Sequence, residues 1–238
     1  SLCSKAIEKR ILPDHTKSFF NQYKTMDPRD KRVVEFSEWS ILARTDVVGT
    51  ELPPRKNIFI DGDAFTGMVL NPEDAPIPVD FDKRALIPVM TPYVLPRKFD
   101  DVLVIGSGGG PDVWNALCAG AKTVDAVEIN PTTARIMKDE YRKASNDLFL
   151  RPGVTLYNEE GRSFVRSRST RYDVVMINAI DTFAALSSGA YMLAENYLYT
   201  VEGTIDYVTQ LKPEGTLCIT RWDYSGETLR LFAVMLEA

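Results

Sequence analysis

The sequence is poor in the residues that most metal and nucleophilic sites need. Its 238 residues include one histidine, His15, and three cysteines, Cys3, Cys118 and Cys218. A single histidine argues against a Ser-His-Asp triad and against a multi-histidine metal centre. The cysteines lack metal-type spacing and are odd in number, which indicates a reducing compartment. We therefore expect a cytoplasmic protein without a metal.

Long apolar runs and an excess of positive charge are also missing. No run reaches the roughly 18–20 residues of a membrane span, and no signal peptide is visible. The net charge of -5 and the pI near 5.1 argue against a nucleic-acid surface. Four arginines are a local exception that fits a solvated helix face better than a phosphate patch: Arg162, Arg166, Arg168 and Arg171.

The two ends of the chain bear on what surrounds it. The sequence starts without Met, and residues 227–238 have the pattern of an amphipathic helix with no stop signal. We therefore expect a piece of a longer protein. Whether that larger protein is attached to a membrane is left open, and so is whether the chain forms a homodimer.

The composition, 45% hydrophobic and 26% charged residues, is that of a soluble globular protein. The length suits one α/β domain with a small appendage. Residues 1–95 combine a polar stretch with β-rich segments over 32–70, in which Asp61-Gly62 is a hairpin-turn dipeptide. We predict an N-terminal segment with a small antiparallel β unit over 1–95, and a Rossmann-like nucleoside-binding domain over 96–238.

The second part alternates strands and helices. Strands are predicted at 101–105, 123–128, 154–157, 173–178 and 215–221, and helices at 112–119, 131–144, 160–168, 190–198 and 201–210. Asn130 before Pro131 is typical of a helix start, and Lys212–Gly215 predicts a turn. The alternation predicts an α/β fold with a doubly wound parallel sheet, which binds ligands at the carboxyl ends of its strands.

The most informative stretch is Asp101–Asn130, DVLVIGSGGGPDVWNALCAGAKTVDAVEIN. An apolar strand leads into Gly106, Gly108 and Gly110, where the backbone turns and a ligand can approach closely. Glu128 ends the next strand, at a spacing that lets a carboxylate bind ribose hydroxyls. We therefore predict a nucleoside site; a purely structural turn is the alternative, as is a solvent-exposed strand end for Glu128.

Two further acidic positions follow later strands. Glu160 and Gly161 come after the third strand, where an acidic residue followed by a small one can bind adenine; the alternative is a charge that stabilises a helix N-terminus. Asp181 follows the fourth strand, where a carboxylate can orient an attacking amine or accept its proton. Its alternative role is to cap the next loop or helix.

These motifs resemble the spermidine synthase family in order and spacing. The matching segments are GSGGGPD, AVEINP, EEGRSF, YDVVMINAID and LAENYLYTVEGTIDYVTQLKPEGTL, together with NIFIDGDAF before the domain. The resemblance covers about residues 32–222 and is closest to divergent spermidine-synthase-like domains with the fold of S-adenosylmethionine-dependent methyltransferases. It implies S-adenosylmethionine or its decarboxylated form as co-substrate, and an amine or another small molecule as acceptor.

The departures from the family concern mainly the acceptor half of the site. Gly109 stands where the family has an Asp that holds the ligand's amino end, and Asp112 is a candidate substitute. Asn178 replaces the Asp that acts as the family's base, and an amide cannot accept a proton. Asp181 is kept, and Thr182 follows it in place of Pro. The family's polyamine-binding Gln falls at Phe65 or Thr66, and its Tyr-His-Glu segment is absent near 83–85.

The sequence thus predicts a transferase that moves an aminopropyl group from decarboxylated S-adenosylmethionine to an amine. Three alternatives remain open. They are methyl transfer from S-adenosylmethionine, an inactive nucleoside-binding module of a larger protein, and an NAD-dependent oxidoreductase. The last is disfavoured because the glycines at 106, 108 and 110 do not have the dinucleotide spacing.

Overall fold

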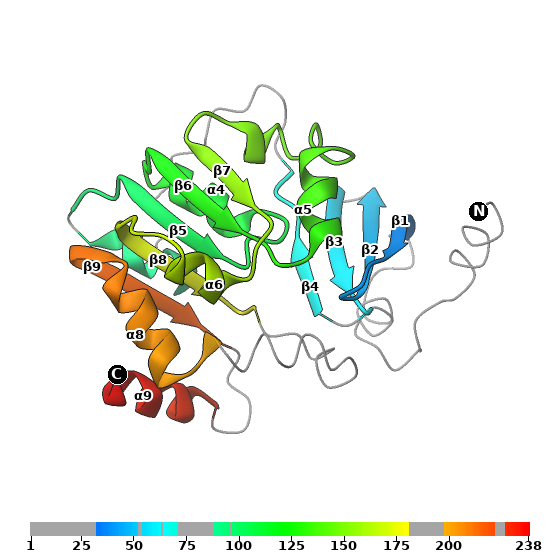
Figure 1. The fold of residues 1–238 in the computed structure, drawn as a ribbon. Helices are drawn as coiled ribbons and strands as arrows, with labels where there is room; N and C mark the ends of the chain where they lie inside the picture. Colours follow the sequence, from blue (N-terminus) through cyan, green and yellow to red (C-terminus); the bar gives the residue numbers. More distant parts are fainter. Residues whose placement is uncertain are drawn as a thin grey trace.

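The residues that the structure describes form two β-sheets that lie side by side (Figure 1). The computed structural model describes residues 32–51, 54–62, 64–70, 88–95, 97–180, 198–221 and 227–238. The predicted Asp181 and almost all of the predicted helix 190–198 lie outside these ranges.

The smaller sheet is an antiparallel meander in the order β1-β2-β3-β4. Its strands are Arg32–Trp39, Arg44–Glu51, Pro54–Ile60 and Ala64–Gly67. The predicted hairpin turn is confirmed, because Asp61 and Gly62 both have positive φ between β3 and β4. This sheet is the β unit expected ahead of the main domain.

The larger sheet has five parallel strands in the order β7-β6-β5-β8-β9. They are β5 (Asp101–Ile105), β6 (Thr123–Val127), β7 (Val154–Tyr157), β8 (Tyr172–Asn178) and β9 (Leu211–Thr220). The first strand of this sheet in the sequence, β5, lies in the middle, and later strands are added on both sides of it. The fold class predicted from the alternation is confirmed.

Helices cover both faces of this parallel sheet (Figure 1). One face carries α4 (Pro111–Cys118), α5 (Pro131–Lys138) and the 3-10 helix η1 (Pro88–Val94). The other carries α6 (Gly161–Arg166) and α8 (Val201–Thr209), with α9 (Glu227–Glu237) against α8. A 3-10 turn, η2 (Leu148–Leu150), precedes β7. Every helix in the described ranges falls short of the length and hydropathy that a bilayer span requires.

Two predictions differ from the structure by more than two residues. The helix predicted over 131–144 ends at Lys138, and residues up to 147 form turns. The turn predicted over Lys212–Gly215 lies inside β9 as a break in register, where Tyr172 pairs with Leu211 but Val174 pairs with Thr216. Glu214 has a φ of 65° there, which is the local signature of the turn.

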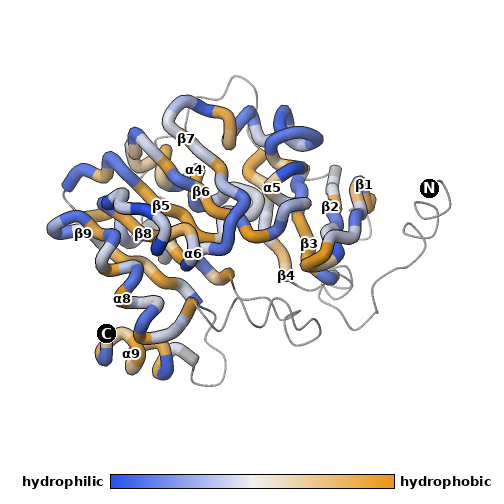
Figure 2. The backbone as a smooth tube through the Cα atoms, in the orientation of Figure 1, coloured by the Kyte–Doolittle hydropathy of each residue, from blue (hydrophilic) through white to orange (hydrophobic). Residues whose placement is uncertain are grey.

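The core is continuous between the two sheets. Val47 and Ile58 of the small sheet belong to the same buried cluster as Val104 of β5 and Ile136 of α5. A second cluster lies between the parallel sheet and helices α6 and α8. Figure 2 shows hydrophobic residues along the central strands and hydrophilic ones in the surrounding loops. The division at residue 95 stays a prediction.

Candidate nucleoside site at the carboxyl edge of the parallel sheet

Parallel pairing brings the strand ends together at one edge of the sheet. Ile105 pairs with Val127 and with Ile177, and Val127 pairs with Tyr157. The residues that follow these strands therefore lie along the same edge: Gly106, Glu128, Glu160 and Asn178. The predicted site residues that the structure describes are brought together in this way, although they span more than 70 positions of sequence.

Glu128 is buried directly beside the glycine loop. Its side chain is 8% exposed, and its Oε2 accepts a 2.9 Å hydrogen bond from the N–H of Gly108. Its Oε1 accepts a 2.8 Å bond from the N–H of Asn130. Burial raises the pKa of the Glu128 carboxyl, while these backbone N–H groups act in the opposite direction. The solvent-exposed alternative is therefore wrong. The backbone of Ile129 also hydrogen-bonds the carboxylate, which leaves it a lone pair for a further donor.

The glycine loop itself is closely packed. Gly106 has a φ of 76°, and a Cβ atom there would overlap the side chain of Ile180. Gly110 has a φ of 93°, and a Cβ atom there would overlap Leu148. Both glycines are thus required by backbone conformation and by protein contacts. Their predicted role toward a ligand stays a prediction, and a ligand above Gly106 requires the Ile180 side chain to move.

The small sheet contacts the same loop. A Cβ atom at Gly108 would crowd the Thr66 side chain, and the Oγ1 of Thr66 accepts a 3.3 Å hydrogen bond from the N–H of Gly109. Val69 donates its N–H to the Gly109 carbonyl at 3.2 Å. Gly109, which stands where the family has an Asp, is therefore covered by backbone from the small sheet.

Asp112 and Asn178 form a second polar pair at this edge. Asp112 is the second residue of α4, and Asn178 ends β8. The Nδ2 of Asn178 donates to both carboxylate oxygens of Asp112, at 3.2 Å to Oδ1 and 3.0 Å to Oδ2. Burial raises the pKa of Asp112, and the bond from Asn178 partly offsets this. The candidate substitute for the family's loop Asp is therefore in direct contact with the residue that replaces the family's base.

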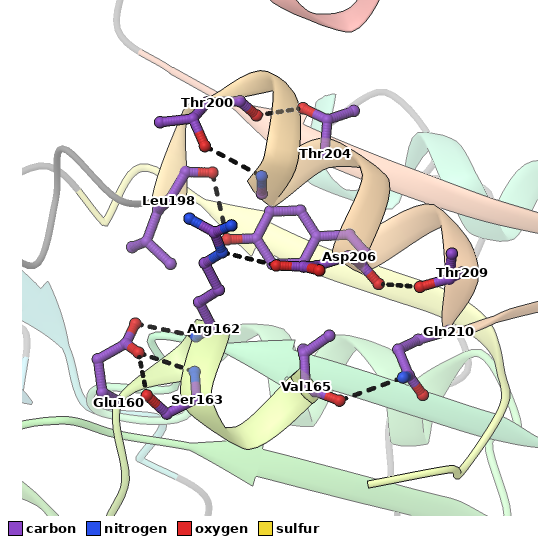
Figure 3. Close-up of polar contacts among 12 residues, drawn as sticks. Glu160, Arg162, Ser163, Val165, Leu198, Thr200, Thr204, Asp206, Thr209 and Gln210 are labelled. Atoms are coloured by element: carbon purple, nitrogen blue, oxygen red, sulfur yellow. Dashed lines mark hydrogen bonds and ion pairs between the residues drawn. The ribbon is translucent and has the colours of Figure 1, made fainter. Parts of the chain in front are cut away.

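Glu160 caps helix α6 (Figure 3). Its Oε1 accepts from the N–H of Arg162 at 2.9 Å, and its Oε2 accepts from the N–H and hydroxyl of Ser163, both at 2.8 Å. Glu160 thus stabilises the N-terminus of α6, which was the alternative to adenine binding. Binding of adenine by Glu160 stays a prediction. Gly161 has no room for a side chain, because a Cβ atom would overlap Ile105.

The arginines that follow bind carboxylates. Arg162 extends from α6 to Asp206 on α8, with a distance of 2.6 Å between Nε and Oδ2 (Figure 3). Arg168 binds Glu159 at 2.8 Å, and its guanidinium stacks 3.8 Å from the ring centre of Phe164. These contacts hold α6 against its neighbours, and they agree with a structural role for the arginines.

Two residues of this edge carry no local signal in the sequence. Ile180 lies over Gly106, and Tyr93 of η1 is 3% exposed with a hydroxyl that has no hydrogen-bond partner among the described residues. Both are apolar or aromatic residues in ordinary apolar surroundings. Only their position in the fold brings them to the site.

Known proteins are similar to this chain in part of its sequence and in its fold. No family model matches the sequence. The polyamine aminopropyltransferase of Alkaliphilus metalliredigens is 30% identical over 94 residues, 39% of this chain and 33% of that protein. The enzyme of the same name from Alkaliphilus oremlandii is 32% identical over 93 residues, 39% of this chain and 32% of that protein. The match thus spans about a third of the length of these curated relatives.

The solved structures define the fold. A spermidine synthase in complex with the transition state analogue AdoDATO has a TM-score of 0.57 and 19% identity, over 77% of this chain and 56% of that chain. The spermidine synthase of Thermotoga maritima has a TM-score of 0.54 and 19% identity, over 77% of this chain and 55% of that chain. The chain has the α/β fold of spermidine synthase. Part of the sequence is thus similar to polyamine aminopropyltransferases, and the fold is similar to that of spermidine synthase.

Proposed function

We propose that this chain binds decarboxylated S-adenosylmethionine at the carboxyl edge of the parallel sheet and transfers its aminopropyl group to an amine. The observation that carries the proposal is the buried Glu128 beside the glycine loop, in a chain similar to polyamine aminopropyltransferases. Glu128 would accept hydrogen bonds from the ribose diol. Gly106, Gly108 and Gly110 would lie against the sulfonium-bearing chain.

The chemistry of this transfer asks little of the protein beyond alignment. The amine nitrogen attacks the propyl carbon next to the sulfonium, and methylthioadenosine leaves as a neutral thioether. Because the leaving group is already good, holding the reacting atoms about 3–3.5 Å apart provides most of the acceleration. Asp181 is proposed to orient the amine. A cytoplasmic location and a homodimer are part of the same proposal.

Calorimetry with four ligands tests it: decarboxylated S-adenosylmethionine, S-adenosylmethionine, methylthioadenosine and NAD. We expect the decarboxylated ligand to bind most tightly, and incubation with a diamine to release methylthioadenosine and an aminopropylated product. Tighter binding of S-adenosylmethionine, with methylation of an acceptor, would replace the proposal with methyl transfer. Absence of binding by all adenosine ligands would leave only a scaffold.

A further inference from the structure

Asp112 is a buried carboxylate without a counter-charge. Its side chain is 7% exposed, and no ion pair reaches it from any residue in the described ranges. Its hydrogen-bond donors there are amides, Asn178 and Asn115. An ionised carboxylate taken out of water without a cation is costly. The N-terminus of α4 offsets only part of that cost.

A second polar group, the Tyr93 hydroxyl, lies next to Asp112. The Tyr93 hydroxyl is buried without a hydrogen-bond partner among the described residues, and the charge of Asp112 acts on it together with burial to raise the pKa of Tyr93. Buried polar groups in native proteins normally have partners. An anion without a cation and a hydroxyl without a partner, close together at the ligand edge, point to a ligand that is cationic and donates hydrogen bonds.

Glu128 lies at the same edge but is held in a different way from Asp112. Its two oxygens accept backbone N–H groups from the glycine loop and from Asn130, which fix its position. Asp112 is held by side-chain amides, and the backbone around it belongs to α4. Of the two buried carboxylates, Glu128 is therefore built to hold a fixed neutral diol, and Asp112 to meet a charged group.

We propose that Asp112, which the family resemblance makes a candidate for holding the amino end of the co-substrate, instead binds the acceptor amine and receives its proton, and that Asn178 positions the Asp112 carboxylate. This inference rests on the proposed function. The amine approaches as an ammonium ion paired with Asp112 and loses one proton to solvent. Its nitrogen then forms a bond to the propyl carbon while the carbon–sulfur bond breaks with its electron pair on sulfur. The second proton of the new ammonium passes to Asp112, which returns it to solvent.

Asp112→Asn tests this assignment with the shape of the side chain preserved. We expect kcat/KM for a diamine to fall about 100-fold, the usual contribution of a general base, while the Kd for methylthioadenosine changes less than twofold. Asp206→Asn is the matched control, because it removes a carboxylate on α8, on the opposite face of the sheet. Wild-type kinetics in Asp112→Asn would overturn the inference.

Asn178→Asp provides a readout that a purely structural role would not move. It places a second carboxylate about 3 Å from Asp112, at the position now held by the amide nitrogen, and like charges at that distance raise a pKa. We expect the acidic limb of the pH–rate profile to shift to higher pH. An unmoved limb argues against Asp112 as the base.

Direct amine binding separates this inference from the proposed function. Titration of 1,4-diaminobutane into the protein loaded with methylthioadenosine needs no turnover. We expect Asp112→Asn to bind at least tenfold more weakly than the wild type. If the wild type binds the diamine but does not transfer an aminopropyl group, the proposed function fails and the binding role of Asp112 stands. If both proteins bind equally, or neither binds, the inference fails.

Discussion

Glu128 combines a structural and a proposed binding role in one carboxylate. It accepts the N–H groups of Gly108 and Asn130, and so holds the glycine loop to the end of β6. The same arrangement leaves the carboxylate a lone pair at the edge where the ribose is expected. Substitution by alanine would remove both roles at once, whereas glutamine keeps one acceptor oxygen.

Glu128→Gln is predicted to weaken the affinity for methylthioadenosine at least tenfold. A hydrogen bond to a charged group contributes about 1.5–3 kcal/mol, and about 1.4 kcal/mol corresponds to a factor of ten. Calorimetry measures the change, with Glu202→Gln on the exposed first turn of α8 as control. Unchanged affinity would remove Glu128 from the site and leave it as an anchor of the loop.

At the scale of elements, the start of α5 connects the two sheets. Asn130 is 1% exposed and caps α5, with its Oδ1 accepting from Thr132 at 2.9 Å and Thr133 at 3.3 Å. Its Nδ2 donates at 3.0 Å to the hydroxyl of Thr45 in β2. Glu38 of β1 adds a second link through Arg135 at 2.9 Å. The small sheet is thereby fixed next to the glycine loop.

Asn130→Ala is predicted to lower the free energy of unfolding by about 2 kcal/mol. A lost N-cap costs about 1 kcal/mol and a lost buried hydrogen bond a similar amount. Thr45→Val removes only the bond between the sheets and should cost about half as much. Urea unfolding of the two variants measures both values. Equal losses would mean that the cap contributes nothing measurable.

At the scale of the whole molecule, Asp112 and Glu128 affect how stability depends on pH. Burial raises the pKa of both Asp112 and Glu128. The folded protein therefore keeps protons that the unfolded chain has already lost, and the stability they contribute is present at low pH and lost as pH rises through the raised pKa values. Asp101 acts in the opposite sense, because hydrogen bonds from Lys212 and Thr123 lower its pKa.

Asp112→Asn is predicted to become more stable relative to the wild type as pH rises from about 4 toward 7. Below about 3.9, the usual pKa of an aspartic acid, both folded and unfolded wild type are protonated at this position, and the variant gains nothing. Asp101 and Glu128 are unchanged in the variant, so their effects cancel in the difference. Thermal unfolding at several pH values measures the difference in stability between the variant and the wild type. A difference that stays constant with pH contradicts the assignment of a raised pKa to Asp112.

The sequence by itself determined the local structure and the class of the fold. Strand bounds at 101–105 and 154–157, the turn at Asp61-Gly62 and the cap at Asn130 all follow from signals within a few residues. Apolar runs alternating with helical patterns were sufficient to predict a parallel sheet, and they indicate the edge at which a ligand is expected. Glu128, the acidic residue after β6, was predictable from the same alternation of strands and helices.

Only the tertiary structure decided what these residues contact. Asp112 and Asn178 are 66 positions apart, and Thr66 meets Gly109 across 43 positions. The cap made by Glu160 could be proposed from sequence but not chosen over a binding role, since both use the same carboxylate. Contacts between distant segments depend on how helices and sheets pack, and no local pattern encodes that packing.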